Sequence, residues 1–260
     1  MKIKYHGITD KGAVRDANED SILCGEVLVN SNNHYEMTEI IETDVSIQPI
    51  WFAIADGMGG HDSGEIASRI TLEKLLNSFK TKGTVYLNDP TMLIELIKQI
   101  HKDVNEYGTG SGKQSMGTTL VGMLFNQEKF YLYNVGDSRI YLLRDGYLQQ
   151  KTRDHSLKEQ IGINVAKNFI ISSIGGGKDD IIIDLYDLSD QIKDNDLFVI
   201  SSDGLTDFNY EDSYDEFETL INDSKDKLDQ LDRSLIRYAI NKGSKDNISI
   251  ISIFIENTTV

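Results

Sequence analysis

Short apolar segments separated by turn residues recur along the chain, and they predict nine β-strands. Each segment has the length of a strand and an alternating or continuously apolar pattern. The predicted strands are residues 3–8, 22–29, 50–55, 119–125, 129–135, 139–144, 181–186, 197–200 and 248–255. Asp145-Gly146 and Asn126-Gln127-Glu128 separate neighbouring segments. The first is typical of a two-residue hairpin turn and the second is a weaker turn signal, so these strands are expected to pair antiparallel.

Three segments with helical periodicity interrupt the strands. One covers about residues 63–79, one begins after the candidate N-cap Asp89 and ends at Gly108, and one covers about residues 224–242. Pro90 suits the first position of the second helix, where its missing N–H is not needed. Two adjacent helices between groups of strands indicate an α+β fold with helices covering sheets, rather than a repeating βαβ winding.

The composition is that of a folded globular protein, with 39% hydrophobic and 26% charged residues. A length of 260 residues is enough for one large core, so residues 1–260 are expected to form a single domain. The longest apolar runs are too short to span a bilayer, and the N-terminus lacks an apolar secretion signal. The single cysteine, Cys24, excludes an internal disulfide and is interpreted as a core residue. These features predict a cytoplasmic protein without membrane contact.

The charge of the chain narrows its partners. There are 42 acidic residues against 26 Lys and Arg residues, which gives a formal net charge of −16. Nucleic acids and anionic lipids need a basic surface, so neither is expected as a partner. The same charge disfavours a phosphorylated substrate unless its site is strongly positive.

Several common catalytic sites are excluded by spacing. In the segment 108–114, Gln114 follows Lys113 where a phosphate-binding P-loop needs Ser or Thr. The sequence has neither the His-Glu-x-x-His pattern of zinc proteases nor the Gly-x-Ser-x-Gly turn of serine hydrolases. A cysteine phosphatase needs an arginine in the loop after its nucleophile, and Asn30 stands six residues after Cys24.

Aspartates stand where predicted strands meet turns. Asp56, Asp137 and Asp203 follow apolar strands and have adjoining glycines, and Asp246 precedes the last strand. Each by itself is explained by turn chemistry, since aspartate is common in turns and Asp-Gly is a frequent turn dipeptide. If three of these carboxylates converge, their repulsion and desolvation cost several kcal/mol unless cations neutralise them. A site made only of oxygen ligands selects hard ions such as magnesium or manganese.

The order of the motifs along the chain resembles the metal-dependent 2C-type (PPM) protein serine/threonine phosphatases, in their bacterial form. The similarity extends from Thr9 to the last strand, and the ordered set is far more specific than any single motif. The matching segments are Thr9-Asp10-Lys11-Gly12, Arg15, Asn18-Glu19-Asp20-Ser21, Asp56-Gly57-Met58-Gly59-Gly60-His61, Gly64-Glu65, Ala67-Ser68, Met116-Gly117-Thr118-Thr119, Val135-Gly136-Asp137-Ser138-Arg139, Thr152-x-Asp154-His155-Ser156, Ser201-Ser202-Asp203-Gly204 and Asp246-Asn247.

The resemblance implies a four-layer α-β-β-α sandwich, in which helix pairs flank two antiparallel sheets and a dinuclear Mg/Mn centre lies at one edge. By the family's pattern, Asp56 bridges both metal ions. Asp203 and Asp246 complete the first metal site, and the carbonyl of Gly57 belongs to the second.

Further residues are assigned by the same resemblance. Glu19 and Asp20 hold metal-bound waters, and Asp20 is assigned to the metal residues. Glu19 and Asn247 are assigned to the groups that act on the metal ions indirectly, through a water or through another ligand. Asp137 matches a position that helps to bind a third ion, and Arg15 matches the residue that grips the substrate phosphate. Together with Asp56, Arg15 is assigned to catalysis.

Elementary electrostatics supports this assignment. Two divalent cations against three carboxylates leave a local charge of about +1, and Arg15 adds another. Metal ions about 4 Å apart can share a water and lower its pKa towards neutrality. The planar guanidinium of Arg15 can bind two phosphate oxygens; the alternative interpretation of Arg15 is a surface salt bridge. The expected reaction is direct hydrolysis of phosphoserine and phosphothreonine in proteins, without a covalent enzyme intermediate.

Three departures from the family pattern stand out. Met58 occupies a position where eukaryotic relatives carry a histidine proton donor, so that donor must be replaced by metal-bound water or another group. His61 and His155 lie near in sequence, but structural hydrogen bonding is the favoured interpretation for both. The segment 157–169 is shorter than the flap that is usual in bacterial relatives. The segment 30–48 is longer than the usual connection between its two strands, and it is interpreted as an excursion or hairpin that offers a partner surface.

Two other functions were weighed. A catalytically dead family member would act as a binding module, but the metal aspartates are all present. An acidic globular protein without metal is the third possibility. The favoured hypothesis is an active monomeric phosphatase whose partners are phosphoserine and phosphothreonine proteins, including a cognate kinase and its substrates.

Overall fold

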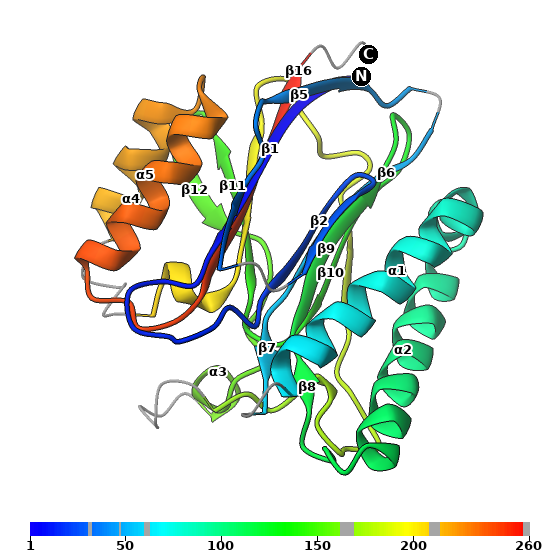
Figure 1. Cartoon of the computed structure of the whole chain (residues 1–260). Helices are drawn as coiled ribbons and strands as arrows, with labels where there is room; N and C mark the ends of the chain where they lie inside the picture. Colours follow the sequence, from blue (N-terminus) through cyan, green and yellow to red (C-terminus); the bar gives the residue numbers. More distant parts are fainter. Residues whose placement is uncertain (31–32, 47, 60–62, 162–168, 208–213, 257–260) are drawn as a thin grey trace.

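Two antiparallel β-sheets lie face to face, and a pair of helices covers the outer face of each (Figure 1). This computed structural model describes residues 1–30, 33–46, 48–59, 63–161, 169–207 and 214–256. The prediction of an α+β fold with a four-layer α-β-β-α arrangement is confirmed.

The first sheet combines the beginning of the chain with its last strand. β1 pairs with β16 over nine residues, from Lys2 opposite Glu256 to Asp10 opposite Ile248. In spatial order this sheet contains β12 (Tyr147–Gln150), β11 (Arg139–Arg144), β15 (Leu197–Ser201), β16 (Ile248–Glu256), β1 (Lys2–Asp10) and β4 (His34–Glu36), with β5 (Ile41–Asp44) also paired to β1.

The second sheet is built from the middle of the chain, joined by the hairpin strands β2 and β3. In spatial order it contains β14 (Asp184–Asp187), β10 (Phe130–Val135), β9 (Leu120–Phe125), β6 (Ile50–Ala55), β2 (Ser21–Cys24) and β3 (Val27–Asn30). A small third sheet extends one end of the molecule and contains β13 (Ile174–Gly175), β8 (Gly117–Thr118) and β7 (Gly57–Met58).

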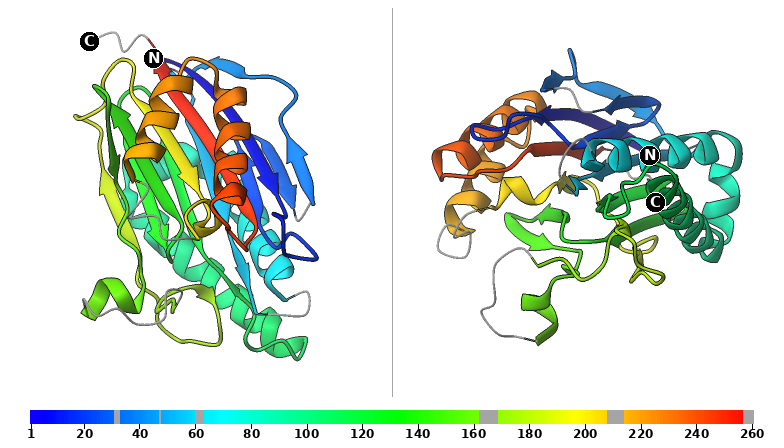
Figure 2. Two further views of the ribbon diagram at one scale, coloured as in Figure 1. Left: turned by 90° about the vertical axis from the view of Figure 1, so that its left-hand side faces the viewer. Right: turned by 60° about the horizontal axis from the view of Figure 1, so that its bottom comes forward.

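The helices complete the outer layers. α1 (Ser63–Asn88) and α2 (Pro90–Gly110) pack on the second sheet, and α4 (Tyr214–Ser224) and α5 (Leu228–Asn241) pack on the first, as the side view shows (Figure 2). The short α3 (Leu157–Ile161) stands apart from both pairs. None of the helices in the described ranges has the length and apolarity that a bilayer crossing requires.

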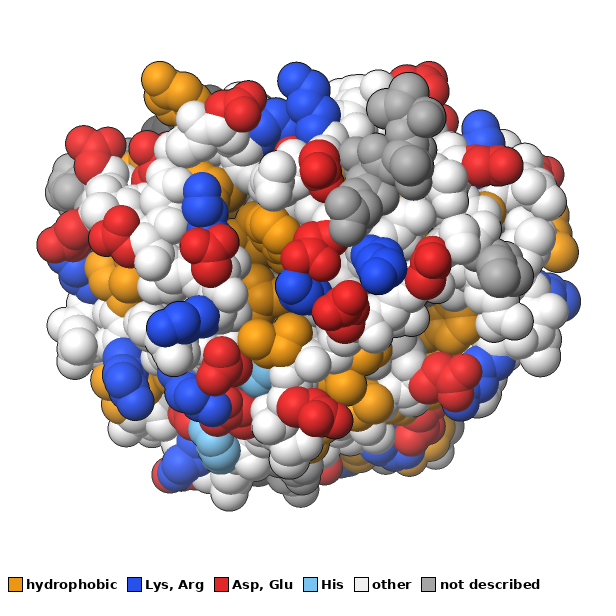
Figure 3. Space-filling model, turned by 90° about the horizontal axis from the view of Figure 1, so that it is seen from above, with side chains coloured by type: hydrophobic (Ala, Val, Ile, Leu, Met, Phe, Trp, Pro, Cys, Tyr) orange, Lys and Arg blue, Asp and Glu red, His pale blue; other side chains and the backbone are white. Residues whose placement is uncertain are grey.

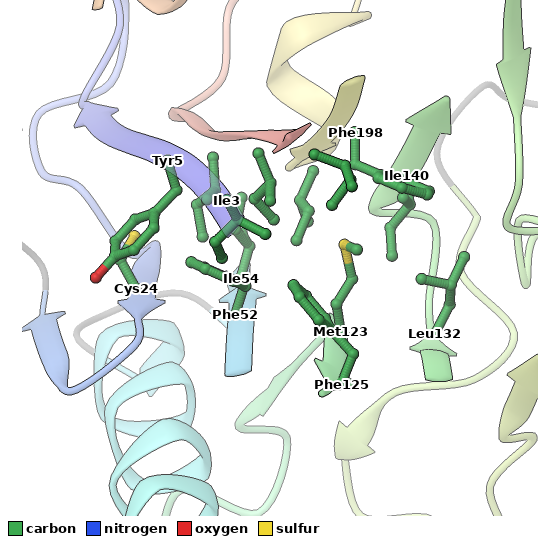
Figure 4. Packing of buried hydrophobic residues seen from close by; sticks show 14 of the residues in the cluster. Ile3, Tyr5, Cys24, Phe52, Ile54, Met123, Phe125, Leu132, Ile140 and Phe198 are labelled. Atoms are coloured by element: carbon green, nitrogen blue, oxygen red, sulfur yellow. The ribbon is translucent and has the colours of Figure 1, made fainter. Parts of the chain in front are cut away.

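The strand period of two distributes apolar side chains between layers. In β6, Phe52 and Ile54 point into the space between the sheets, whereas Trp51 and Ala53 pack against the helices on the other face. Side chains of both sheets meet in the central layer, where Phe198 of β15 contacts Phe130 of β10 at a ring-centroid distance of 5.2 Å. Figure 4 shows this layer from close by. Cys24 is buried there, as expected.

Several predicted elements have different boundaries in the structure. Residues 22–29 form two strands and not one, because Gly25 adopts a φ of 58° and donates its N–H to Trp51 O, which reverses the chain. α1 continues to Asn88, well beyond the predicted end. The helix predicted over residues 224–242 begins at Leu228, and α4 precedes it without having been predicted.

The excursion predicted over residues 30–48 supplies β4 and β5, which both pair with β1. A cavity of about 450 Å³ opens beside β5 at the end of the molecule where β1 and β6 begin. Figure 3 shows the molecule from above, with hydrophobic side chains surrounded by interspersed acidic and basic ones.

Candidate metal centre

Acidic side chains from both sheets approach one another at the end of the sandwich where β6 and β15 finish (lower end of Figure 1). Asp56 follows β6, and its pKa is raised well above the usual value, first by burial and then by the charges of four other aspartates. Those four are Asp20, Asp203, Asp246 and Asp137. Residues separated by up to 226 positions in the sequence therefore share one electrostatic environment.

Asp20 is the most enclosed acid of this group. Its side chain is fully buried, and burial raises its pKa to about 7 against the opposing hydrogen bonds of Ser249 and Ser202. Both hydroxyls donate to the same oxygen, Oδ2, at 2.6 and 2.9 Å. The other oxygen, Oδ1, is buried and has no hydrogen-bond partner within the described part of the chain.

Asp137 and Asp203 show the same pattern. Burial, followed by the charge of Asp154, raises the pKa of Asp137 to about 6. Burial and then the charge of Asp137 raise the pKa of Asp203 well above its usual range. Each has a buried Oδ1 atom without a partner among the residues that the structure describes. Leaving a buried acceptor unsatisfied is costly, so these oxygens call for a cation or a donor that is not part of the described chain.

The backbone around Asp56 is held rigidly. Asp56 O accepts from Thr119 N at 2.9 Å and from the Thr118 hydroxyl at 2.8 Å, while Asp56 N donates to the Thr119 hydroxyl at 3.1 Å. A side chain at Gly57 is sterically excluded, because its Cβ would lie 2.3 Å from Gly64 O and 2.6 Å from Glu19 O. These contacts bring the backbone of Gly57, and with it that of Asp56, close to Gly64 at the start of α1 and to Glu19.

Asp246 and Asn247 connect the last strand to the loop that carries Arg15. Arg15 Nη2 donates to Asp246 Oδ2 at 2.6 Å, and about half of the Arg15 side chain is exposed. Asn247 is buried; its Nδ2 donates to Lys11 O and Ala17 O, and its Oδ1 accepts from Glu19 N. Arg15 therefore lies at the acid cluster, which is the group of Asp20, Asp56, Asp137, Asp203 and Asp246, and it is bound to one member of that cluster.

The donors fit a hard divalent cation, although they are not arranged as a finished cage. Across the described ranges, no group of three or more His, Cys, Asp or Glu side chains meets the spacing of a ready metal site. Asp246 is directed to Arg15, while Asp20, Asp137 and Asp203 each keep an unpaired buried oxygen. Carboxylate oxygens in this number suit magnesium or manganese.

The histidines near the predicted motifs have separate roles. His155 is buried; its Nδ1 accepts from Gly136 N, and its Nε2 lies 3.1 Å from Asp184 Oδ2, which agrees with the structural interpretation. His61 lies outside the described residues. Met58 is half-buried in β7 and offers no proton, so the position of the eukaryotic histidine supplies none here.

Comparison with known proteins identifies the family. The family model described as Protein phosphatase 2C matches residues 42–236. The chain belongs to the protein phosphatase 2C family. The serine/threonine phosphatase stp of Listeria monocytogenes is 31% identical over 260 residues, which cover 94% of this chain and 93% of that protein. The resemblance seen in the motifs is thus confirmed, and the activity is that of a protein serine/threonine phosphatase.

Solved structures of the 2C family agree. The Streptococcus agalactiae serine/threonine phosphatase matches with a TM-score of 0.81 and 26% identity, over 98% of this chain and 100% of that one. The catalytic domain of the phosphatase PstP, solved in complex with two manganese ions, matches with a TM-score of 0.70 and 22% identity, over 99% of this chain and 100% of that one. The second likeness shows the shared fold.

The hydroxyl groups that hold the acids in place had no role assigned to them from the sequence. Ser202 and Ser249 bind Asp20, and Thr118 and Thr119 bind the backbone of Asp56. Ser249 is also bound to Thr9 of the neighbouring strand at 2.7 Å. Thr118, Thr119 and Ser202 stand in segments that match the family, but the motifs do not show what these hydroxyls bind. Ser249 lies in an otherwise apolar strand, and hydroxyl residues are common in strands without function.

Proposed function

We propose that this phosphatase hydrolyses phosphoserine and phosphothreonine in proteins at a dinuclear Mg/Mn centre formed by its acid cluster. The observation that carries the proposal is the set of buried aspartates that raise one another's pKa and leave oxygens unpaired. The two manganese ions in the PstP catalytic domain support it. The proposed metal residues are Asp56, Gly57 through its carbonyl, Asp203, Asp246, Asp20 and, for a third ion, Asp137.

The charges explain why an acidic protein accepts a phosphorylated substrate. Divalent ions held by these carboxylates would supply a nucleophilic water at neutral pH and would offset the negative charge of the site. The backbone of Asp56 is fixed by its contacts with Thr118 and Thr119, so Asp56 would hold the ions from a defined position. Glu19 and Asn247 hold the loop around the site and act through water or through a ligand.

Arg15 is the proposed phosphate ligand. It is half-exposed, and its guanidinium already binds a carboxylate oxygen of Asp246. Phosphate presents similarly spaced anionic oxygens, so the same side chain can bind two of them. Arg15 therefore contributes substrate orientation and charge stabilisation, whereas the carboxylates hold the ions.

The finer partners follow from the substrate class. Phosphoproteins are substrates of the family, and we infer that a serine/threonine kinase and its products are the relevant partners. We also infer that residues 1–260 act as one domain and as a monomer in the cytoplasm. Size-exclusion chromatography with light scattering tests the monomer directly, since a dimer would double the mass of 29.3 kDa.

The central experiment is manganese-dependent release of phosphate from a phosphothreonine peptide. Release is expected with manganese, and it should fall to background when excess chelator is added. Turnover that survives complete chelation would contradict the proposed centre. A chain that binds manganese and is stabilised by it, but releases no phosphate, would support the catalytically dead alternative.

Replacing Arg15 with alanine is expected to lower kcat/KM for the phosphopeptide by about 100-fold, mainly through a higher KM, because a bidentate charged contact is lost. Arg15→Lys should recover part of this loss. Arg69→Ala is the matched control, since Arg69 forms a partly exposed surface pair with Glu73 on α1. An unchanged kcat/KM in Arg15→Ala would show that another group holds the phosphate.

A further inference from the structure

Arg139 occupies a junction between the acid cluster and the segment that leads into the flap. It is the first residue of β11, two positions after Asp137. In the sheet it stands opposite Ser201, two positions before Asp203. Arg139 is thus close along the backbone to Asp137 and, across the sheet, close to Asp203, which are two of the proposed metal residues.

The guanidinium of Arg139 connects three separate segments. Its Nε and Nη2 donate to both oxygens of Asp154, the latter at 2.6 Å, in a two-pronged ion pair. Its Nη1 donates to the hydroxyls of Tyr141 and Thr206, both at 3.2 Å. Thr206 in turn donates its N–H to Asp203 O at 2.7 Å and so closes the turn that carries Asp203. The ion pair is largely enclosed, with 21% of Arg139 and 15% of Asp154 exposed.

The segment beyond Asp154 is fastened to the turn of Asp137. His155 N donates to Gly136 O at 2.8 Å, and Gly136 N donates to His155 Nδ1 at 3.1 Å. The far side of the flap returns to the same place, since Ile171 N donates to His155 O at 2.8 Å. Both ends of the flap are therefore anchored next to Asp137, and the Arg139–Asp154 pair joins this anchor to the turn of Asp203.

We propose that Arg139 is a positioning residue that sets the separation of Asp137 and Asp203 and fixes the base of the flap beside them. The inference rests on the proposed metal centre. Planar, two-pronged binding gives a guanidinium a defined orientation that an ammonium group does not have. Groups that orient metal ligands in this way typically change metal affinity by about 10- to 100-fold when they are removed.

The same strand provides a matched control. Arg144 is the last residue of β11 and binds Asp196 through Nε and Nη2, with 26% of Arg144 exposed. This second pair has the same chemistry and is also enclosed, with Asp196 fully buried, but it lies at the opposite end of the strand from the acid cluster. Loss of an enclosed arginine–aspartate pair should lower the stability of the protein in the same way whether Arg139 or Arg144 is replaced.

The test compares Arg139→Gln with Arg144→Gln by three measurements: the Tm in chelator, manganese affinity by calorimetry without substrate, and kcat/KM on a phosphothreonine peptide. Both variants should have a lower Tm than the wild type in chelator. Only Arg139→Gln should weaken manganese binding by about 10-fold or more and lower kcat/KM, while Arg144→Gln stays within about twofold of the wild type. Arg139→Lys should fall between wild type and Arg139→Gln.

Equal manganese affinity in the two glutamine variants would overturn the proposal and leave Arg139 a structural residue. If Arg139→Gln does not fold, Thr206→Val decides, because it removes the hydroxyl that accepts from Arg139 Nη1 and donates to Asp203 O, through which Arg139 reaches the turn of Asp203. A severalfold weaker manganese affinity in Thr206→Val supports the proposal, and an unchanged affinity overturns it. Manganese affinity is measured by calorimetry without substrate, so it can be compared between variants even if the wild type proves inactive. An inactive wild type would contradict the proposed function, whereas equal manganese affinities would contradict the role of Arg139.

Discussion

Replacing Asp56 with asparagine is expected to abolish phosphatase activity and, at the same time, to stabilise the metal-free protein. Asparagine keeps the shape but loses the charge needed to bridge two cations, so kcat should fall by about 1,000-fold or more. In chelator, however, the substitution removes one of five aspartates whose charges oppose one another. We therefore expect the free energy of unfolding to rise by about 1–3 kcal/mol.

The measurements are phosphate release from a phosphothreonine peptide and urea unfolding in chelator. Asp187→Asn is the control, because Asp187 is an exposed acid of β14 whose pKa is lowered by its hydrogen bonds with Ser189. It should leave activity unchanged and should not stabilise the protein. Activity of Asp56→Asn within tenfold of the wild type would refute the bridging role. An unchanged or reduced free energy of unfolding would refute the opposing charges.

Manganese binding is expected to release protons. Burial raises the pKa of Asp20 to about 7 and that of Asp137 to about 6, so the metal-free protein carries carboxyl protons near neutrality. A cation displaces them, because it binds the ionised form. Calorimetry at pH 7 in two buffers of different ionisation enthalpy should show the release of about one proton or more, and manganese affinity should increase with pH. Identical enthalpies in both buffers would contradict this expectation.

The same protons make the metal-free protein less stable as the pH rises. A raised carboxyl pKa means that the folded chain holds protons that the unfolded chain has already lost above about pH 4. The free energy of unfolding should therefore fall as the pH increases from about 4 through the folded values near 6 and 7, by about 1.4 kcal/mol per pH unit for each extra proton. Urea unfolding in chelator measures this slope, and saturating manganese should flatten it or reverse its sign.

Local sequence patterns predicted the strands better than their partners. β6, β9 and β11 lie within a residue of the predicted ranges, since each is an apolar run bounded by turn residues. The pairing of β1 with β16 could not be read from either segment, because it depends on contacts between residues more than 230 positions apart. α4 was missed for a related reason: only Phe217 and Ile221 of its short sequence are buried, so its apolar stripe is too sparse to recognise.

The acid cluster was predictable in its members but not in its geometry. Each aspartate could be placed at a strand end, yet only the family resemblance indicated which of them meet. The pairing of Arg15 with Asp246 and the two hydroxyls on Asp20 are details of three-dimensional packing. Asp154 illustrates the limit, because its motif was recognised while its contact with Arg139 could not be anticipated from spacing.

The position of β16 has a consequence for synthesis of the protein. β1 is synthesised long before β16, and it finds its nine-residue partner only when residues 248–256 have emerged from the ribosome. Asp246 and Asn247, which directly precede that partner, reach Arg15 and the Glu19 loop at the same late stage. A chain that ends before β16 therefore lacks both the partner of β1 and the residues that join Arg15 and Glu19 to the last strand.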